Sequence, residues 1–296
     1  MMNLKVSQLC KQLDTFKLDN LSFQIEAGTV MGFIGENGAG KTSTIHTILQ
    51  LLKQDSGSIE IFGEPYTIDS IHLKQQIGVV FDSLHFPTSL KVKELEQMYK
   101  EFYTNWDSDY FYSLLERLNI PKHNPVDKMS AGTQKKLTIA LALGYYPKLL
   151  LLDEPTSQLD PIIRDEILTI LSEYMEEGDR SILFSSHITS DIEKIADTIM
   201  LIRDGKISFV ENKDELLYAY RTFKGTIEQS LAIPKKAIYG RRESVFGIEL
   251  LVKRDLVPPS VPLIRAELED IIVMRSKELK RNEMVKSAKE RAGFLD

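Results

Sequence analysis

The chain has 296 residues, 43% of them hydrophobic and 27% charged, and its formal net charge is −6. This length can bury a large core in one or two domains, and the acidic balance argues against a dedicated nucleic-acid binder, which would usually show a basic face. The single cysteine, Cys10, excludes an intrachain disulfide, so we expect a reducing compartment, most simply the cytoplasm.

Two strands are predicted near the start of the chain. Residues 18–26 alternate between apolar and polar side chains, which indicates a half-buried strand. After a glycine turn, the apolar run at 30–34 indicates a strand that is fully buried. Phe16, which precedes both strands, could stack on a purine base or simply pack in the core, and the sequence does not decide between the two.

A glycine-rich segment joins the buried strand to a predicted helix at 42–52. Its sequence fits the phosphate-binding pattern G-x-x-x-x-G-K-[ST]. Glycines let successive backbone N–H groups point at one anion, and the helix N-terminus adds positive charge. Lys41 can then reach the outer phosphates of a nucleotide, and the Thr42 hydroxyl can ligate the Mg²⁺ that bridges them. A loose turn before an amphipathic helix is the plainer alternative. The predicted nucleotide-binding residues of this segment are Gly35, Glu36, Asn37, Gly38, Ala39, Gly40, Lys41, Thr42 and Ser43.

Helical patterns dominate from about residue 90 to residue 144, and the region is rich in aromatic residues. These rings either form the core of a small helical subdomain or line a surface groove that grips a partner helix. We expect the core to take most of them. The cluster consists of Tyr99, Phe102, Tyr103, Trp106, Tyr110, Phe111 and Tyr112.

Two further buried strands end in polar residues. Residues 147–160 contain four successive leucines, which indicate a strand covered on both faces, as in a parallel sheet. Asp153 and Glu154 follow at its carboxyl end, the edge where open α/β sheets bind ligands. A helix is predicted to begin after Asp160. The strand at 181–187 ends in His187, which we therefore expect at the same edge.

The composition changes in the last quarter of the chain. Residues 221–265 mix short apolar pieces with glycine and proline, and residues 266–291 are charge-dense and helical in pattern. We therefore predict a nucleotide-binding domain over residues 1–220, with its helical subdomain at about 87–145. A small accessory α+β domain without a chemical motif is predicted over residues 221–296.

The phosphate loop, the paired carboxylates and the segment that follows them together resemble the ATP-binding cassette (ABC) ATPases, over roughly residues 3–218. The resemblance implies an α/β P-loop NTPase of ABC type. Its core is a mixed sheet, accompanied by an antiparallel β subdomain and a helical subdomain.

The resemblance also implies roles for individual residues. Asp153 would serve Mg²⁺, and Glu154 would polarise the water that attacks ATP. His187 would be the family's switch histidine, which contacts the γ-phosphate. Asp160 would belong to the D-loop, the segment after the carboxylate pair. ATP and Mg²⁺ are therefore the expected cofactors.

Two motifs depart from the family's pattern. The signature LSGGQ corresponds to Met129–Thr133, where Ser130 and Gly132 are kept while Ala131 and Thr133 differ. All four residues are expected to contact the ATP bound to a second subunit. The glutamine of the family's Q-loop corresponds to Asp82, which could still approach Mg²⁺. Leu13 stands where the family has a base-stacking aromatic residue, so Phe16 is the candidate substitute.

Segments at 79–82 and 102–107, with the C-terminal extension, resemble ATPase subunits of ABC-2-type exporters in Gram-positive bacteria. Those relatives export peptides, antibiotics or other amphipathic compounds. The resemblance implies a second ATPase subunit, identical or different, and an integral membrane transporter subunit.

Neither a signal peptide nor an apolar run of the ~20 residues that span a bilayer is recognised, so other chains would supply the membrane spans. We accordingly expect a peripheral protein at the inner face of the cell membrane, with no nucleic acid as partner. The alternatives are a non-transport ABC ATPase acting on ribosomes or nucleic acid, a P-loop kinase of small molecules, and a regulatory protein that only binds nucleotide.

Overall fold

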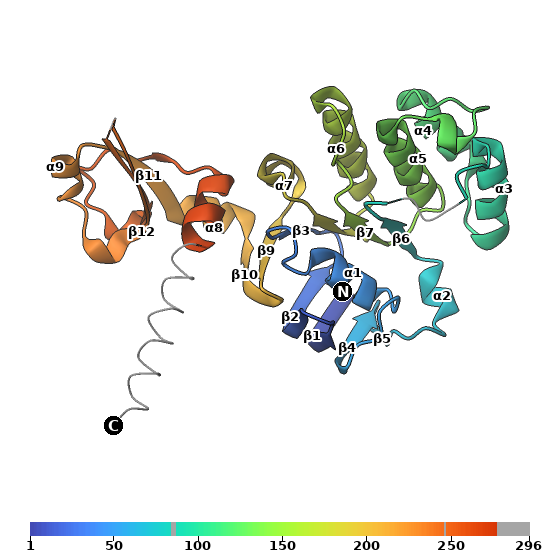
Figure 1. Ribbon diagram of the computed structural model, residues 1–296, viewed down its shortest axis with the longest axis horizontal. Coiled ribbons are helices and arrows are strands. Elements are labelled where there is room, and N and C mark those ends of the chain that lie inside the picture. The colour runs from blue at the N-terminus through green and yellow to red at the C-terminus, as the bar shows by residue number, and fades with distance from the viewer. Residues whose placement is uncertain (84–86, 246, 277–296) are drawn as a thin grey trace. The chain divides into compact units, whose positions relative to one another are not determined.

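The computed structural model describes residues 1–83, 87–245 and 247–276 (Figure 1). The chain divides into two compact units, Met1–Val210 and Glu211–Asp296. This division lies before the boundary after residue 220 that composition suggests. The C-terminal segment predicted to be helical, residues 266–291, is helical over residues 268–276 and not at 266–267, and its part from residue 277 lies outside the described residues.

A largely parallel sheet forms the centre of the first unit. Strand β3 pairs in parallel with β8 and β9, and β7 pairs in parallel with β6 and β8. The carboxyl ends of these strands therefore meet at one edge, where polar residues follow the apolar runs. The strands, in the order β10-β9-β3-β8-β7-β6, are β10 (Lys206–Asn212), β9 (Thr198–Arg203), β3 (Val30–Ile34), β8 (Ser181–Ser185), β7 (Leu149–Asp153) and β6 (Ile77–Val80).

An antiparallel sheet lies against the central sheet through a shared apolar core. The predicted alternation of β2 is confirmed, since Leu21, Phe23 and Ile25 are buried while the residues between them are exposed. One buried cluster joins residues of both sheets with Ile45 and Ile48 of the first helix. The sheet has the order β2-β1-β4-β5, with β2 (Lys17–Glu26), β1 (Met2–Gln12), β4 (Ser56–Ile61) and β5 (Glu64–Pro65).

Helix α1 (Lys41–Ile48) starts directly after the glycine-rich loop and ends earlier than the apolar stripe suggests. Gly40 is its N-cap residue, with φ 113°, a left-handed conformation that glycine adopts readily. Gln50 also has a positive φ, 60°, and so cannot continue the helix.

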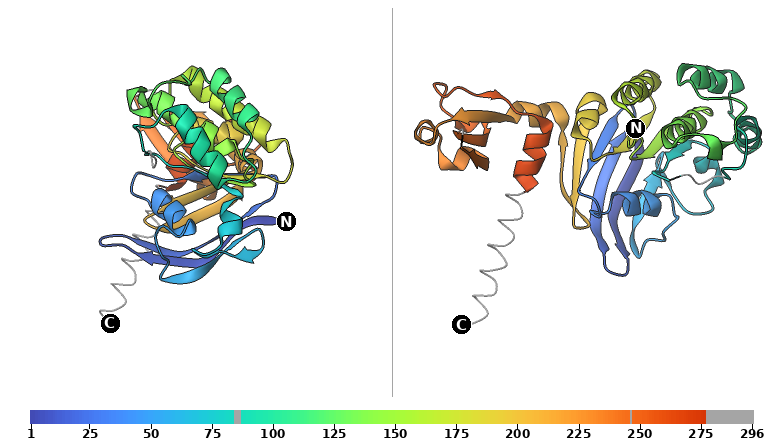
Figure 2. Two further views of the ribbon diagram at one scale, coloured as in Figure 1. Left: turned by 90° about the vertical axis from the view of Figure 1, so that its right-hand side faces the viewer. Right: turned by 45° about the horizontal axis from the view of Figure 1, so that its top comes forward.

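The helical subdomain and the antiparallel sheet lie on opposite sides of the central sheet (Figures 1 and 2). The aromatic rings of the helical subdomain mostly pack against one another. For example, Tyr103 stacks on Tyr145 with 3.7 Å between ring centroids. Phe111 is fully buried and Phe102 is 66% exposed, while the other five rings of the cluster are half-buried, so the rings divide between the core and the surface. The helices between β5 and β7 are α2 (Ile71–Lys74), α3 (Val92–Phe102), α4 (Ser108–Arg117), η1 (Val126–Lys128) and α5 (Ala131–Leu143).

Two helices follow the strands that carry the polar residues. Helix α6 (Pro161–Met175) follows β7, and α7 (Thr189–Ile195) follows β8. The Asp160 side chain accepts hydrogen bonds from the backbone N–H groups of Ile162 and Ile163, as the N-cap prediction requires. Across the described residues, no helix is long and apolar enough to cross a membrane.

The second unit is a small antiparallel sheet with short helices. Phe223, Ile248 and Leu250 are among the buried side chains on one face of the sheet. The sheet has the order β12-β13-β11-β14, with β12 (Ile238–Ser244), β13 (Gly247–Lys253), β11 (Tyr220–Gly225) and β14 (Ile264–Arg265). The short helical elements are α8 (Lys213–Ala219), α9 (Ile227–Ser230), η2 (Lys235–Ala237) and η3 (Arg254–Leu256).

Candidate functional site

A cavity of about 690 Å³ opens over the glycine-rich loop at the carboxyl edge of the central sheet. Its volume lies within the usual range for small-molecule sites, roughly 300–1,000 Å³. It brings together most residues of the predicted loop with Phe16, Asp82 and Glu154. The lining residues are Leu13, Asp14, Thr15, Phe16, Glu36, Asn37, Gly38, Gly40, Lys41, Thr42, Ser43, Asp82 and Glu154.

The loop closes tightly against its surroundings. A Cβ atom on Gly35 would lie 2.7 Å from the Ile202 carbonyl oxygen, so only glycine fits there. Ala39, the other predicted loop residue that does not line the cavity, is buried. A Cβ atom on Gly40 would lie 2.8 Å from the Phe16 ring. Phe16 therefore both packs against the core and faces the cavity, so the two readings of this residue are compatible.

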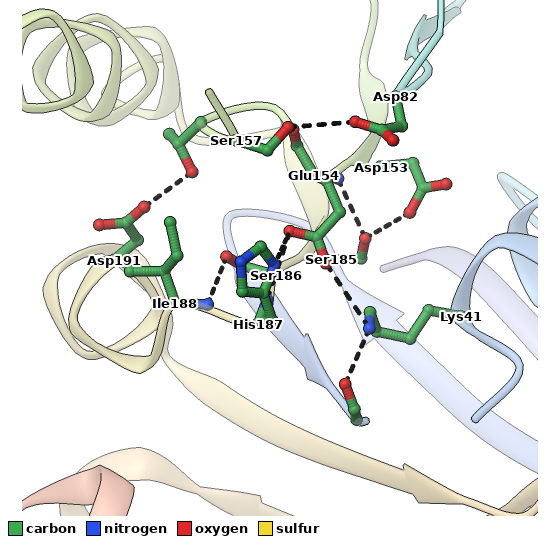
Figure 3. Close-up of polar contacts among 12 residues, drawn as sticks. Lys41, Asp82, Asp153, Glu154, Ser157, Ser185, Ser186, His187, Ile188 and Asp191 are labelled. Carbon is green, nitrogen blue, oxygen red and sulfur yellow. Dashed lines mark hydrogen bonds and ion pairs between the residues drawn. The ribbon is translucent and has the colours of Figure 1, made fainter. Parts of the chain in front are cut away.

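Lys41 is buried, with 7% of its surface exposed, and its ammonium group has two polar neighbours. Nζ donates a hydrogen bond of 2.8 Å to the Gly35 carbonyl oxygen and lies 3.5 Å from Oε1 of Glu154 (Figure 3). A buried ammonium requires such partners because its desolvation is costly. The ammonium is thus held at the N-terminus of α1, beside the glycine-rich loop.

Asp153 ends β7 and is held by hydroxyl groups from two other elements. The Thr42 hydroxyl donates to Oδ2 over 2.7 Å, and the Ser185 hydroxyl donates to Oδ1 over 2.6 Å. Asp153 is 1% exposed, so these two bonds fix the direction of its carboxylate. Ser185 was not among the predicted site residues. The sequence did contain a signal for it, since Ser185 and Ser186 directly follow an apolar run.

Glu154 and His187, each predicted separately as a catalytic residue, meet in the structure because β7 and β8 are neighbours. Oε2 of Glu154 lies 2.7 Å from Nδ1 of His187 and also accepts a bond from the His187 backbone N–H (Figure 3). Glu154 has φ 49°, a left-handed conformation that costs a non-glycine residue roughly 1–2 kcal/mol. Such strain persists only where the surroundings impose it, and it often marks functional sites.

Asp82 lines the cavity from the segment after β6, and its carboxylate is already engaged. Oδ1 accepts a hydrogen bond of 3.1 Å from the Ser157 hydroxyl and lies 3.4 Å from Nζ of Lys135. Lys135 is a contact that sequence reasoning did not anticipate. Asp160, by contrast, caps α6 and does not line the cavity.

The predicted signature residues lie at the start of α5, outside the cavity of the same chain. The Ser130 hydroxyl accepts a bond from the backbone N–H of Thr133 and caps the helix. Ser130 and Ala131 are exposed, and Gly132 is half-buried. Within one chain the structure does not bring these residues to the phosphate loop.

Metal binding by protein groups alone is not supported in the described part of the chain, where no group of three or more histidine, cysteine, aspartate or glutamate residues converges. The Thr42 hydroxyl and the Asp153 carboxylate nevertheless converge at the loop. Mg²⁺ is typically bound by such an oxygen pair together with substrate phosphates and water. These residues therefore fit a metal that arrives with a nucleotide.

Sequence comparison identifies related proteins. The profile described as "ABC transporter" matches residues 18–157. The bacitracin transport ATP-binding protein BcrA of Bacillus licheniformis is 35% identical over 207 residues, which cover 69% of this chain and 68% of that protein. The ABC transporter ATP-binding protein YtrB of Bacillus subtilis is 30% identical over 224 residues, which cover 73% and 74%.

Solved structures show the same fold. An ATP-binding subunit of an ABC transporter aligns with a TM-score of 0.66 and 23% identity over 72% of this chain and 91% of that one. A dimeric ATP-binding cassette in a post-hydrolysis state, bound to ADP and phosphate, aligns with a TM-score of 0.64 and 21% identity, covering 71% and 98%. The expected ABC-type fold is thereby confirmed.

Proposed function

The chain belongs to the ABC transporter family as one of its ATP-binding, ATP-hydrolysing proteins, and from this premise we propose that it powers an exporter of peptides, antibiotics or other amphipathic compounds. The observation that carries this choice of cargo is the 35% identity with a bacitracin transport ATP-binding protein. A separate integral membrane subunit would form the export path and hold this chain at the cytoplasmic face of the membrane. Nucleic acid is not a partner in this proposal.

The glycine-rich loop is proposed to hold the phosphates of ATP. Its backbone N–H groups and the α1 N-terminus supply positive potential, and Lys41 supplies a full charge. In the structure the Lys41 ammonium contacts the Gly35 carbonyl and Glu154, so it is already aimed at the cavity. Phe16 is the proposed contact for the base, since it lines the same cavity.

Thr42 and Asp153 are the proposed Mg²⁺ site, the hydroxyl acting directly and the carboxylate directly or through water. The metal would neutralise charge on the phosphates when bound. Ser185 supports this site because its hydrogen bond fixes the Asp153 carboxylate. Asp82 lines the same cavity and is the further candidate ligand.

Glu154 is the proposed base that orients or deprotonates the attacking water. Its carboxylate lies between the Lys41 ammonium, at 3.5 Å, and the His187 ring, at 2.7 Å. The ammonium is placed to hold phosphate beside the base. His187 is proposed to orient Glu154 and to contact the γ-phosphate, since its side chain is 55% exposed and accessible to a ligand.

The signature residues are proposed to complete the site of a second ATPase subunit. Ser130, Ala131, Gly132 and Thr133 stand at the start of a thirteen-residue helix, a position that favours an anion. They do not reach the cavity of their own chain, so a head-to-tail pair of subunits would use them. Asp160 would lie in the segment between the two sites.

Purification from solubilised membranes tests the proposal. The tagged chain should co-purify with a polytopic membrane protein, and the pair should confer ATP-dependent export in vesicles. Lys41→Ala should keep the partner but lose ATP binding and export, because the phosphates lose their buried cation. Lys148→Ala, which removes an exposed lysine paired with Asp179, is the matched control. Recovery with ribosomes instead of a membrane protein would favour the non-transport alternative.

A further inference from the structure

Lys135 is a buried cation on α5 that reaches the cavity's edge from the helix carrying the signature residues. It is 7% exposed. Its ammonium donates hydrogen bonds to the backbone carbonyls of Phe81 and Asp82, over 3.1 and 3.2 Å, and lies 3.4 Å from the Asp82 carboxylate. One side chain thus contacts both the backbone and the charge of the segment that follows β6.

The charge of Asp82 poses a problem for a site that binds a polyanion. Asp82 lines the cavity together with Glu154, and its side chain is 56% exposed. Water screens part of its negative charge, and the remainder opposes phosphate. The Ser157 hydroxyl adds a further bond to Asp82.

We propose that Lys135 is a positioning residue that neutralises Asp82 and fixes the segment after β6 against α5, which allows the cavity to bind a nucleotide despite this carboxylate. The proposal rests on the assignment of the cavity as the nucleotide site. It also links two sites, because α5, the helix capped by Ser130, contacts Asp82 through Lys135 in the chain's own cavity. Lys135 contacts no ligand itself in this proposal.

A double-mutant cycle on the full chain tests the charge pairing. Lys135→Gln removes the charge and retains an amide donor on a side chain one bond shorter, and it should weaken ATP binding about tenfold, as expected for coupled close charges. Adding Asp82→Asn should restore most of the affinity measured with EDTA, where the proposed role of Asp82 as a Mg²⁺ ligand plays no part, since the unpaired carboxylate is then gone. Lys135→Arg should stay near the parent affinity. ATP binding is measured by titration both with Mg²⁺ and with EDTA, and kcat and KM are measured separately.

Lys136→Met is the matched control, because Lys136 is also buried on α5 but donates to the Leu118 carbonyl, away from the cavity. It should lower the melting temperature and leave the ATP dissociation constant unchanged. If Lys135→Gln behaves in the same way, or if Asp82→Asn restores nothing, Lys135 has only a structural role and the proposal is wrong.

If Lys135→Gln does not fold, the cycle is run with Lys135→Arg and Asp82→Asn. The proposal then predicts near-parent ATP affinity for Lys135→Arg and tighter ATP binding with EDTA for Asp82→Asn, because the unpaired Lys135 ammonium would attract phosphate. A tenfold loss in Lys135→Arg, or an unchanged affinity in Asp82→Asn, contradicts it. A parent chain that binds no ATP would instead overturn the assignment of the cavity itself, so the two failures are distinguishable.

Discussion

The two units of the chain differ in how deeply the charged side chains beside their cavities are buried. In the first unit, Lys41 and Asp153 are almost fully buried and their charges are held by hydrogen bonds at the edge of a cavity. In the second unit, Glu249 pairs with Lys224 and Arg242, both more than half exposed. The ion pair with Lys224 is the main cause that lowers the pKa of Glu249.

This difference indicates where chemistry can occur. Buried charges act on a ligand through a low dielectric, whereas exposed pairs are screened by water and contribute little. The hollow beside Lys224 and Glu249 measures about 230 Å³, less than a typical small-molecule site. We therefore locate the reaction in the first unit and treat the second as a structural or partner-binding element.

The largest effect is expected from Glu154→Gln, which tests whether the first unit carries the chemistry. Removing a base should lower kcat about 10²–10⁴-fold, while ATP binding persists because Lys41 and the loop remain. The bound but unhydrolysed nucleotide should trap a dimer, detectable by size-exclusion chromatography with ATP. Glu116→Gln, at an exposed pair with Lys122, is the control and should leave kcat unchanged. A wild-type rate in the Glu154 variant would remove the role assigned to this residue.

The next effect concerns the independence of the second unit. Phe223 is 2% exposed in that unit's core, so Phe223→Ala should destabilise it by about 3–5 kcal/mol. The ATP dissociation constant should stay unchanged if the cavity belongs to the first unit alone, and calorimetry should show a shifted transition. Ile227→Ala, at a site that is 59% exposed, is the control with little expected change. Loss of ATP binding in the Phe223 variant would show that ATP binding by the first unit depends on the second.

A smaller effect should follow from Ser185→Ala. Asp153 would lose the hydrogen bond that directs Oδ1, and the loss of such a supporting partner typically costs about 10–100-fold in metal affinity or activity. The measurement is the Mg²⁺ concentration that gives half-maximal ATPase rate. Ser186→Ala is the control, since the Ser186 hydroxyl is equally buried but accepts from the Ile188 backbone N–H. An equal change in Mg²⁺ requirement for both serines would contradict the special role of Ser185.

Much of the site was predictable because its signals are local. The phosphate loop needs its glycines, lysine and threonine at fixed spacing along one turn, so Gly35 through Thr42 could be read directly. The four leucines before Asp153 predicted a buried strand with a carboxylate at the carboxyl edge of the sheet. The resemblance to ABC ATPases then supplied Glu154 and His187, whose proximity the structure confirms although their roles stay predictions.

Two features could not be predicted from neighbouring residues alone. The length of α1 was overestimated because an apolar stripe continues past Ile48 while the backbone turns at Gln50. The position of the signature relative to a second subunit stays a prediction, since only one chain is described.

By itself, the sequence determined the phosphate loop, the strands that end in polar residues and the family, because each depends on neighbours along the chain. Only the tertiary structure decided which residues, distant along the chain, contact the charged side chains of the site. Ser185 lies 32 residues from Asp153 and Lys135 lies 53 residues from Asp82, yet each pair is in contact. The order of the parallel strands and the packing of α5 beside β6 create these contacts, and no local pattern encodes them.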